Sequence, residues 1–291
     1  MARCGVDRTS TAHRSMQSIL NVMETYAMGY SQDEAERLMF QAGLLWPMTE
    51  RLLRRAGIGP GMRVLDVGSG AGDVALLAAG LVGPTGAVTG IDRDLGSVDR
   101  AAHRARLAGL TSVEFRAATM EEFAGDGLFD AVVGRYVLIR QDDPGAFLRA
   151  AARHVRRGGA IAFHELDVTT ATRHSNPEVQ VWEQTMTWLM QGAAAGCRHY
   201  DAGSRLTGHF AAAGLPEPEI QGEFWAGGGP GSLLYRWAAD TTRTMLPLLA
   251  RLGIPADEVS VETLESRIRS AVVAAGAQVR VFPQYTALAR V

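Results

Sequence analysis

Apolar and polar positions change their periodicity along the chain, and these changes predict its elements. Five short apolar runs have the length and composition of buried strands: residues 62–67, 87–91, 112–116, 130–134 and 160–164. Stretches with helical periodicity separate them, at 74–81, 95–108 and 144–155. Gly158 and Gly159 are expected to form the turn into the fifth strand. This alternation favours right-handed crossovers and predicts a Rossmann-like, doubly wound α/β sheet that is mostly parallel.

Helical patterns flank this core on both sides. Ser31 and Glu34 form a capping box that is expected to open a helix running through Phe40, followed by a second helix at 45–56. Beyond the fifth strand, helices are expected at 177–195, 204–213, 233–252 and 259–275, and strand-like runs at 219–225 and 278–291. The two late strands are suited to pair antiparallel, which predicts an antiparallel C-terminal edge strand.

These patterns indicate one domain with additions rather than two separate domains. We expect an N-terminal helical cap at 1–56 and a sheet domain at 57–291, with helical insertions at about 168–200 and 230–276. The inserted helices carry aromatic and methionine side chains such as Trp182 and Met186. At helical spacing, such side chains are typical of an ordinary core, of a homodimer face or of a ligand pocket.

Composition narrows the possible partners and compartments. The net charge is −2, and all 29 basic residues counted as Lys or Arg are arginines, so a slightly acidic chain argues against a nucleic-acid partner. No apolar run reaches the roughly 18–20 residues of a membrane span. No apolar segment follows Arg3, Arg8 and Arg14, so an export signal is not expected. Cys4 and Cys197 alone make neither a disulfide framework nor a metal site, which favours the cytoplasm.

The strongest chemical signal is the segment 64–73, where an apolar strand runs into Gly68, Gly70 and Gly72 before a helix. Glycine allows positive φ and a close approach of the backbone to a ligand, and the helix N-terminus suits a carboxylate. The nicotinamide fingerprint fits less well, because Asp73 occupies the position of its third glycine. A purely structural strand–helix turn is the remaining interpretation.

A second acid supports a nucleoside site. Asp92 ends the second strand, about 20 residues beyond the glycine turn, where an acid can accept hydrogen bonds from both ribose hydroxyls. Taken alone, the same residue is compatible with a helix N-cap or a solvated loop acid. The glycine turn upstream favours the ribose.

Together these segments resemble the class I S-adenosylmethionine (SAM)-dependent methyltransferases, and most closely the UbiE-like (methyltransferase domain 11/25/31) group. Residues 64–73 resemble motif I, Ile91-Asp92 the acid of motif II, and 129–135 motif IV, while 155–159 resemble the turn before the fifth strand. The resemblance covers about residues 45–166 and the final strands, and it is specific to the superfamily rather than to a substrate. It implies SAM as cofactor and S-adenosylhomocysteine as product.

The resemblance also implies roles for individual residues. The methionine part and the ribose of SAM would be surrounded by Asp66, Gly68, Ser69, Gly70, Asp73, Asp92 and Arg93. The chain departs from the family after the third strand, where Ala118-Thr119-Met120 replaces the usual Gly-Asp-Ala. The adenine contact is therefore left to Thr119, to Glu121 or to the backbone, with Met120 against the purine ring.

Residues after the fourth and fifth strands are expected to face the acceptor, because ligands of open parallel sheets bind beyond the carboxyl ends of the strands. Arg135 suits the SAM carboxylate or an acidic substrate, unless it is a surface arginine. His164 is the candidate general base, since its ordinary pKa lies near 6.5, with Tyr136 and Glu165 as further catalytic candidates. Glu165 or Asp167 would orient the imidazole. A histidine bonded only to a loop carbonyl is the alternative.

The main functional expectation is methyl transfer to an oxygen, a nitrogen or alternatively a carbon atom of a small molecule in specialised metabolism. Alignment for in-line displacement contributes about 7–11 kcal/mol, against a factor of about 10²–10⁴ for a general base, so the base is optional. A protein that keeps SAM as a structural ligand, or a non-methylating catalyst, is the alternative. A nucleic-acid methyltransferase fits less well, because it would favour a basic stripe.

Overall fold

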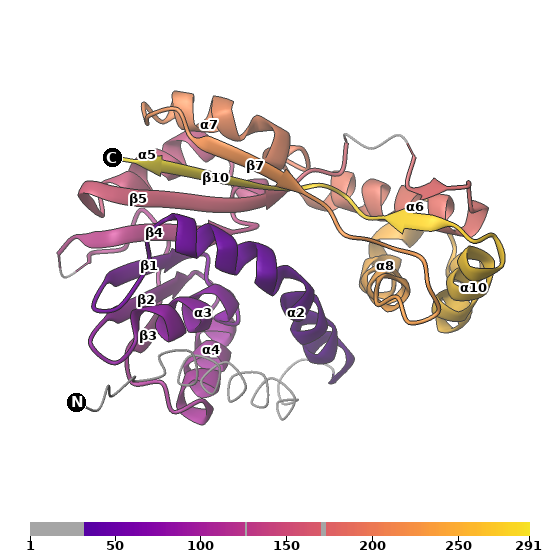
Figure 1. Cartoon of the computed structure of the whole chain (residues 1–291), viewed down its shortest axis with the longest axis horizontal. Coiled ribbons are helices and arrows are strands. Elements are labelled where there is room, and N and C mark those ends of the chain that lie inside the picture. Colours follow the sequence, from indigo (N-terminus) through magenta and orange to yellow (C-terminus); the bar gives the residue numbers. More distant parts are fainter. Residues whose placement is uncertain (1–31, 126, 170–172) are drawn as a thin grey trace, which may run out of the picture.

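A seven-stranded sheet forms the centre of the computed structural model, which describes residues 32–125, 127–169 and 173–291 (Figure 1). The strands lie in the order β3-β2-β1-β4-β5-β10-β7. Their bounds are β1 Arg63–Val67, β2 Ala87–Asp92, β3 Val113–Ala117, β4 Phe129–Arg135, β5 Val155–Leu166, β7 Glu219–Glu223 and β10 Gln284–Arg290. Strands from β3 to β5 pair parallel, whereas β10 pairs antiparallel with β5 and β7. The predicted Rossmann-like sheet with an antiparallel C-terminal strand is confirmed, and β7 takes the outermost place beside that strand.

Helices cover both faces of this sheet, because successive strand residues point to opposite sides. Val64 packs in the core under α3 (Asp73–Val82), while its neighbour Leu65 joins the core under α5 (Pro144–Ala152) and α7 (Leu206–Ala212). The helix α4 (Leu95–Leu107) packs against β2 and β3. The short turn η1 (Leu138–Arg140) follows β4, and η2 (Ala202–Arg205) precedes α7.

One continuous helix, α2 (Gln32–Arg55), stands where two helices were expected. The expected break falls near Gly43, and Pro47 lies inside the helix; both residues are exposed, so the helix continues without burying an unpaired backbone group at either. The predicted N-cap, Ser31, lies outside the described residues. The helix contacts α3, β5, β10 and the inserted helix α8, and therefore crosses from the sheet to the inserted helices (Figure 1).

The inserted segments form a helical lobe with its own hydrophobic core, beyond the carboxyl end of β5 (Figure 1). Its main helices are α6 (Gln180–Gly196), α8 (Leu234–Arg251) and α10 (Val261–Ala274), with the short α9 (Ala256–Val259) before the last. A small antiparallel sheet that the sequence did not predict joins β6 (Ser175–Asn176), β9 (Gln278–Arg280) and β8 (Ala226–Gly227). No helix in the described part of the chain is long and apolar enough to cross a bilayer.

The fifth strand begins earlier than its apolar run indicated. β5 starts at Val155 rather than at residue 160, and α5 ends at Ala152 rather than at Val155. Gly158 and Gly159 lie within the strand instead of forming a turn before it. Gly158 has φ 77°, and the pairing of β5 with β4 shifts register between Phe129 and Ala131. The glycine pair therefore makes an irregularity inside the strand, which a turn pattern in the sequence does not distinguish from a loop.

Candidate functional site

The loop between β1 and α3 has a backbone that only glycine adopts without strain. Gly68, Gly70 and Gly72 have φ of 64°, 52° and 87°. A Cβ on Gly68 would lie 2.8 Å from Val137 Cγ2, and one on Gly72 would lie 2.9 Å from Phe115 Cζ. A Cβ on Gly70 would have no atom within 4 Å. The loop is thus closely packed at its first and last glycines and open at the middle one, where a ligand can approach the backbone.

Gly68→Ala is expected to lower the free energy of unfolding by about 2–5 kcal/mol, because the left-handed backbone costs about 1–2 kcal/mol and crowding against Val137 adds about 1–3 kcal/mol. Gly109→Ala is the matched control, since Gly109 also has positive φ but no atom within 4 Å of its Cβ position. Urea unfolding of both variants measures the difference. Equal losses would show that the contact with Val137 does not restrict this loop.

Asp66, the next-to-last residue of β1, has a buried carboxylate without a hydrogen-bond partner of normal geometry. Its side chain is 1% exposed, and neither oxygen has a hydrogen bond of normal geometry to any described residue, although the backbone N–H of Ala75 lies close enough to lower its pKa. Burial raises the pKa of Asp66 to about 8, although the guanidinium of Arg135 opposes the shift. The hydroxyl of Ser69 is also buried and unpartnered among the described residues. Buried polar groups are usually hydrogen-bonded, so this pair fits a ligand that brings N–H donors, such as the ammonium of a methionine moiety.

Asp92 joins the ends of β1 and β2. Its Oδ2 accepts from the Gly70 N–H at 2.9 Å, and its Oδ1 accepts from the Asp94 N–H at 2.9 Å. Each oxygen keeps a further lone pair, which allows the carboxylate to accept ribose hydroxyls as well. The N-cap of α4 is Asp94, which accepts from the Ser97 N–H at 2.8 Å. Asp92 is therefore not the helix cap that its sequence position also allowed.

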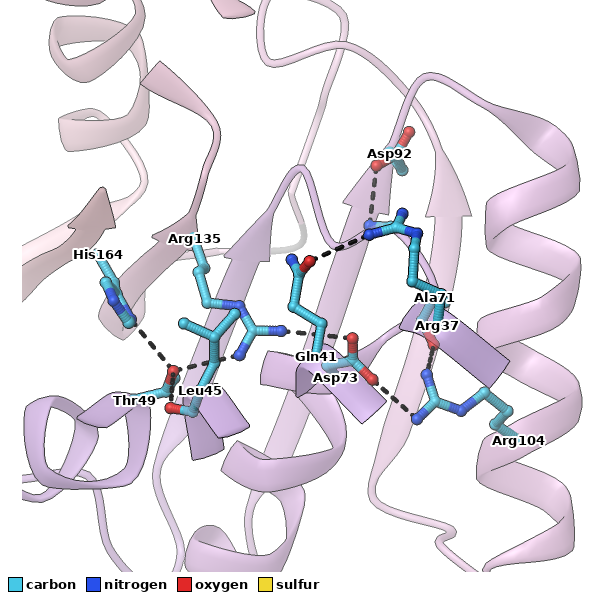
Figure 2. Close-up of polar contacts among 11 residues, drawn as sticks. Arg37, Gln41, Leu45, Thr49, Ala71, Asp73, Asp92, Arg104, Arg135 and His164 are labelled. Carbon is cyan, nitrogen blue, oxygen red and sulfur yellow. Dashed lines mark hydrogen bonds and ion pairs between the residues drawn. The ribbon is translucent and has the colours of Figure 1, made fainter. Parts of the chain in front are cut away.

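Two arginines hold the acid that opens α3 (Figure 2). Asp73 Oδ1 lies 2.8 Å from Arg104 Nη2, and Asp73 Oδ2 lies 3.3 Å from Arg135 Nη2. Burial raises the pKa of Asp73, but the charges of Arg104 and Arg135 lower it by a larger amount, so the net pKa is below the ordinary value. Arg104 also donates to the carbonyl of Ala71 at 2.5 Å. Asp73 and Arg135 are thus engaged with each other rather than presented singly to a ligand.

Arg104 is one of the residues of this site that were not predicted from the sequence. It is 5% exposed, and it lies on the buried stripe of α4 with Val98, Ala101 and Ala105. A charged residue on an apolar stripe is a signal that was present in the sequence, because arginine is seldom buried unless it is paired. Its partner Asp73 is 31 positions away along the chain and becomes visible only when α4 packs beside the glycine loop.

Two residues that follow β3, Met120 and Thr119, are expected to lie beside the adenine. Met120 is 4% exposed, as a wall against a purine ring would require. The hydroxyl of Thr119 donates to Glu122 Oε2 at 3.0 Å, so Glu122 rather than Glu121 lies beside it. Arg93 is exposed. Thr119, Glu121 and the backbone all remain predictions for the contact to the adenine amino group.

His164 and Tyr136 meet at the carboxyl ends of β5 and β4. His164 is fully buried, its Nδ1 lies 3.2 Å from Thr49 Oγ1, and burial together with Arg135 lowers its pKa to about 3. Tyr136 has a positive φ of 58°, and its hydroxyl donates to Gln284 Oε1 at 2.5 Å. The two rings pack edge to face at 5.7 Å between centroids. A strained backbone of this kind is often found at functional sites.

Glu165 supports the turn after β4 instead of contacting the imidazole. Its Oε1 accepts from the N–H groups of Val137 and Leu138, both at 2.8 Å, and burial raises its pKa to about 7 against the opposing effect of these bonds. Asp167 Oδ1 accepts from the N–H and the hydroxyl of Thr169. The expectation that Glu165 or Asp167 orients His164 is wrong, because the ring contacts a threonine that the sequence places far away.

A chain of polar contacts links the acceptor side to the glycine loop (Figure 2). Thr49 of α2 contacts both His164 and Arg135, and Arg135 in turn donates a hydrogen bond to Asp73. Among the residues that the structure describes, no group of three or more histidine, cysteine or acidic side chains is arranged to hold a metal ion.

Comparison with known proteins identifies the family. The model of the "Methyltransferase domain" family matches residues 58–214, which is more than half of the chain. An arsenite methyltransferase of Aquipseudomonas alcaligenes is 35% identical over 36% of this chain and 33% of its own length. A ubiquinone biosynthesis O-methyltransferase of Bordetella avium is 38% identical over 38% of this chain and 46% of its own length.

A solved structure extends the similarity beyond the matched segment. The cyclopropane-fatty-acyl-phospholipid synthase-like protein from Lactobacillus casei superposes with a TM-score of 0.56 at 16% identity, covering 94% of this chain and 99% of its own. At this identity the match shows the fold alone. The chain spans a third to a half of the curated relatives' length, so their substrates are not transferred with the family. The family match, together with a glycine loop and acids that suit the cofactor, shows that this chain belongs to the class I SAM-dependent methyltransferases.

Proposed function

We propose that this methyltransferase acts on an oxygen or nitrogen atom of a small molecule, with a carbon acceptor as the alternative, in specialised metabolism. The main support for SAM binding is the carboxylate of Asp66, which has no hydrogen-bond partner of normal geometry among the described residues, together with the open backbone at Gly70. The ammonium of SAM would satisfy that carboxylate, and the ribose would take the free lone pairs of Asp92. The Ser69 hydroxyl and the backbone N–H groups at the N-terminus of α3 would donate hydrogen bonds to the methionine carboxylate.

Bound SAM supplies a methyl group on a positively charged sulfur, which makes that carbon electrophilic. The residues of this chain then have to align the acceptor and take up the proton that it loses. His164 is proposed as the proton acceptor, and Tyr136 as the side chain that forms the wall beside it. Glu165 is proposed as a positioning residue, because it holds the turn whose Val137 side chain packs against Gly68.

The helical lobe favours a small acceptor. It lies beyond the carboxyl end of β5 (Figure 1), and Val168, two residues after the end of that strand, is part of the lobe's core. We propose that a lobe in this place restricts access to the rim where His164 and Tyr136 meet. An apolar enclosure with few polar groups is typical of small-molecule sites rather than of surfaces that take a macromolecule.

Cysteine content favours an oxygen or nitrogen acceptor over trivalent arsenic, the acceptor in the name of one relative. Soft ions are held by several thiolates. This chain has two cysteines, Cys4 and Cys197, and only the second lies in the described residues. Burial raises the pKa of the Cys197 thiol, which disfavours the thiolate.

Formation of S-adenosylhomocysteine tests the proposal. The purified protein is incubated with SAM and a panel of phenols, hydroxy acids, amines and quinols, and the products are separated by mass spectrometry. We expect S-adenosylhomocysteine above the acceptor-free background with at least one oxygen or nitrogen acceptor. SAM binding without turnover on any acceptor in the panel or in a metabolite extract would support the structural or non-methylating use of SAM instead.

SAM affinity is expected to rise with pH between about 6 and 7.5, by up to about tenfold per unit. The raised pKa of about 8 keeps Asp66 largely protonated over this range, and binding of an ammonium requires the carboxylate, so binding releases a proton. The same raised pKa means that the free protein loses stability as pH rises toward 8. Calorimetry in two buffers of different ionisation enthalpy measures the proton release. Asp66→Asn should bind weakly and without this pH dependence; a pH-independent wild-type affinity would contradict the role of Asp66.

A further inference from the structure

The helix α2 brings a buried hydroxyl to the acceptor side of the sheet. Thr49 is 1% exposed, and its partner His164, at the carboxyl end of β5, is fully buried. No motif of the family match includes Thr49, because the match begins at residue 58. The contact between them joins residues 115 positions apart.

Three groups surround the Thr49 hydroxyl oxygen (Figure 2). The carbonyl of Leu45 lies 3.1 Å away, Arg135 Nη1 lies 3.2 Å away, and His164 Nδ1 lies 3.2 Å away. A hydroxyl has one proton to donate and two lone pairs to accept with. All three contacts can be hydrogen bonds only if one neighbour accepts and two donate.

The chemistry of the three neighbours leaves one solution. A carbonyl only accepts, so the hydroxyl proton points to Leu45. A guanidinium only donates, so Arg135 uses one lone pair of the oxygen. His164 must then donate to the second lone pair, which places a proton on Nδ1. The lowered pKa of the buried ring keeps it neutral, so Nε2 carries no proton.

The other ring nitrogen is left as the hydrogen-bond acceptor of the neutral ring. His164 Nε2 has no hydrogen-bond partner among the described residues. The Gln284 side chain lies close enough to affect the pKa of the ring, but without normal hydrogen-bond geometry. In a neutral imidazole that carries its proton on Nδ1, Nε2 is the atom that can accept a proton.

We propose that Thr49 is a positioning residue that fixes the His164 tautomer, with the proton on Nδ1 and the lone pair on Nε2. The catalytic part of this inference rests on the proposed function, in which His164 Nε2 accepts the acceptor's proton. The same hydroxyl accepts a hydrogen bond from Arg135, which also donates to Asp73. One side chain of α2 therefore links the proton acceptor to the glycine loop.

Nitrogen-15 NMR of the full-length, histidine-labelled protein tests the tautomer without any knowledge of the acceptor. The chain has 7 histidines, and a His164→Gln variant identifies the resonances of His164 by their absence. In the wild type we expect one neutral form, protonated at Nδ1 and unprotonated at Nε2. Thr49→Val should lose this single form and show Nε2–H or a mixture, whereas Thr49→Ser should restore it.

Thr242→Val is the matched control, because Thr242 is equally buried and bonds the carbonyl four residues earlier in α8, but forms no hydrogen bond with any histidine among the described residues. It should leave the His164 resonances unchanged. A wild-type His164 protonated on Nε2, or an unchanged Nδ1–H form in Thr49→Val, would overturn the proposal. SAM binding to the wild type, measured in the same samples, separates the outcomes: the predicted tautomer without SAM binding would contradict the proposed function and leave the role of Thr49 standing.

Discussion

Asp92→Ala is expected to weaken SAM binding at least about 100-fold. The carboxylate would lose two charge-assisted hydrogen bonds to ribose hydroxyls, worth about 1.5–3 kcal/mol each, and about 1.4 kcal/mol corresponds to a factor of ten. The substitution also releases the Gly70 N–H, which Asp92 now holds at 2.9 Å, so the open part of the loop becomes less ordered. Titration calorimetry with SAM and with S-adenosylhomocysteine measures the loss.

Asp94→Ala provides the matched control for this variant. Asp94 is an acid two positions further along, and its side chain caps α4 through Ser97 while its backbone N–H bonds Asp92. The alanine keeps that N–H and removes the cap and the exposed ion pair with Arg100, so stability should fall slightly and SAM affinity should stay close to that of the wild type. Equal affinities for Asp92→Ala and Asp94→Ala would remove Asp92 from the site.

Arg104→Met is expected to lower the free energy of unfolding by about 3–5 kcal/mol, the usual cost of removing one partner of a buried ion pair. Methionine fills a similar volume, but it leaves the Ala71 carbonyl without its donor and Asp73 with Arg135 alone. Because Ala71 and Asp73 belong to the glycine loop, SAM affinity should fall as well. Urea unfolding with and without saturating SAM measures both effects.

Arg106→Met separates the ion pair from the general effect of a new methionine in α4. Arg106 is exposed on the same helix, two positions from Arg104, so its replacement should change stability by no more than about 0.5 kcal/mol. Similar unfolding curves for the two variants would mean that the buried arginine does not stabilise the loop.

Local patterns in the sequence were sufficient for the parallel part of the fold. Strands that are buried on both faces appear as short apolar runs, and the glycine turn and Asp92 mark the ends of two of them. The small sheet of β6, β8 and β9 was missed because two of its strands have only two residues each, too few to show any periodicity. The continuous α2 was divided in two because an exposed glycine, Gly43, resembles a helix boundary.

The cofactor side and the acceptor side of the site differed in how far they could be predicted. The residues that we propose to contact the cofactor through the backbone, such as Gly68 and Gly70, follow from a local motif. The partner of His164 does not, because Thr49 reaches it only after a helix outside the motif packs across the ends of the strands. Long-range polar contacts of this kind depend on packing, which no periodicity encodes.

The most direct test of the whole account is a crystal structure of the protein with S-adenosylhomocysteine. We expect the ligand in the corner between the glycine loop and Asp92, with its ribose hydroxyls on the Asp92 carboxylate and its ammonium directed to Asp66. A ligand bound elsewhere, or this corner empty at saturating concentration while the loop is well ordered, would contradict it.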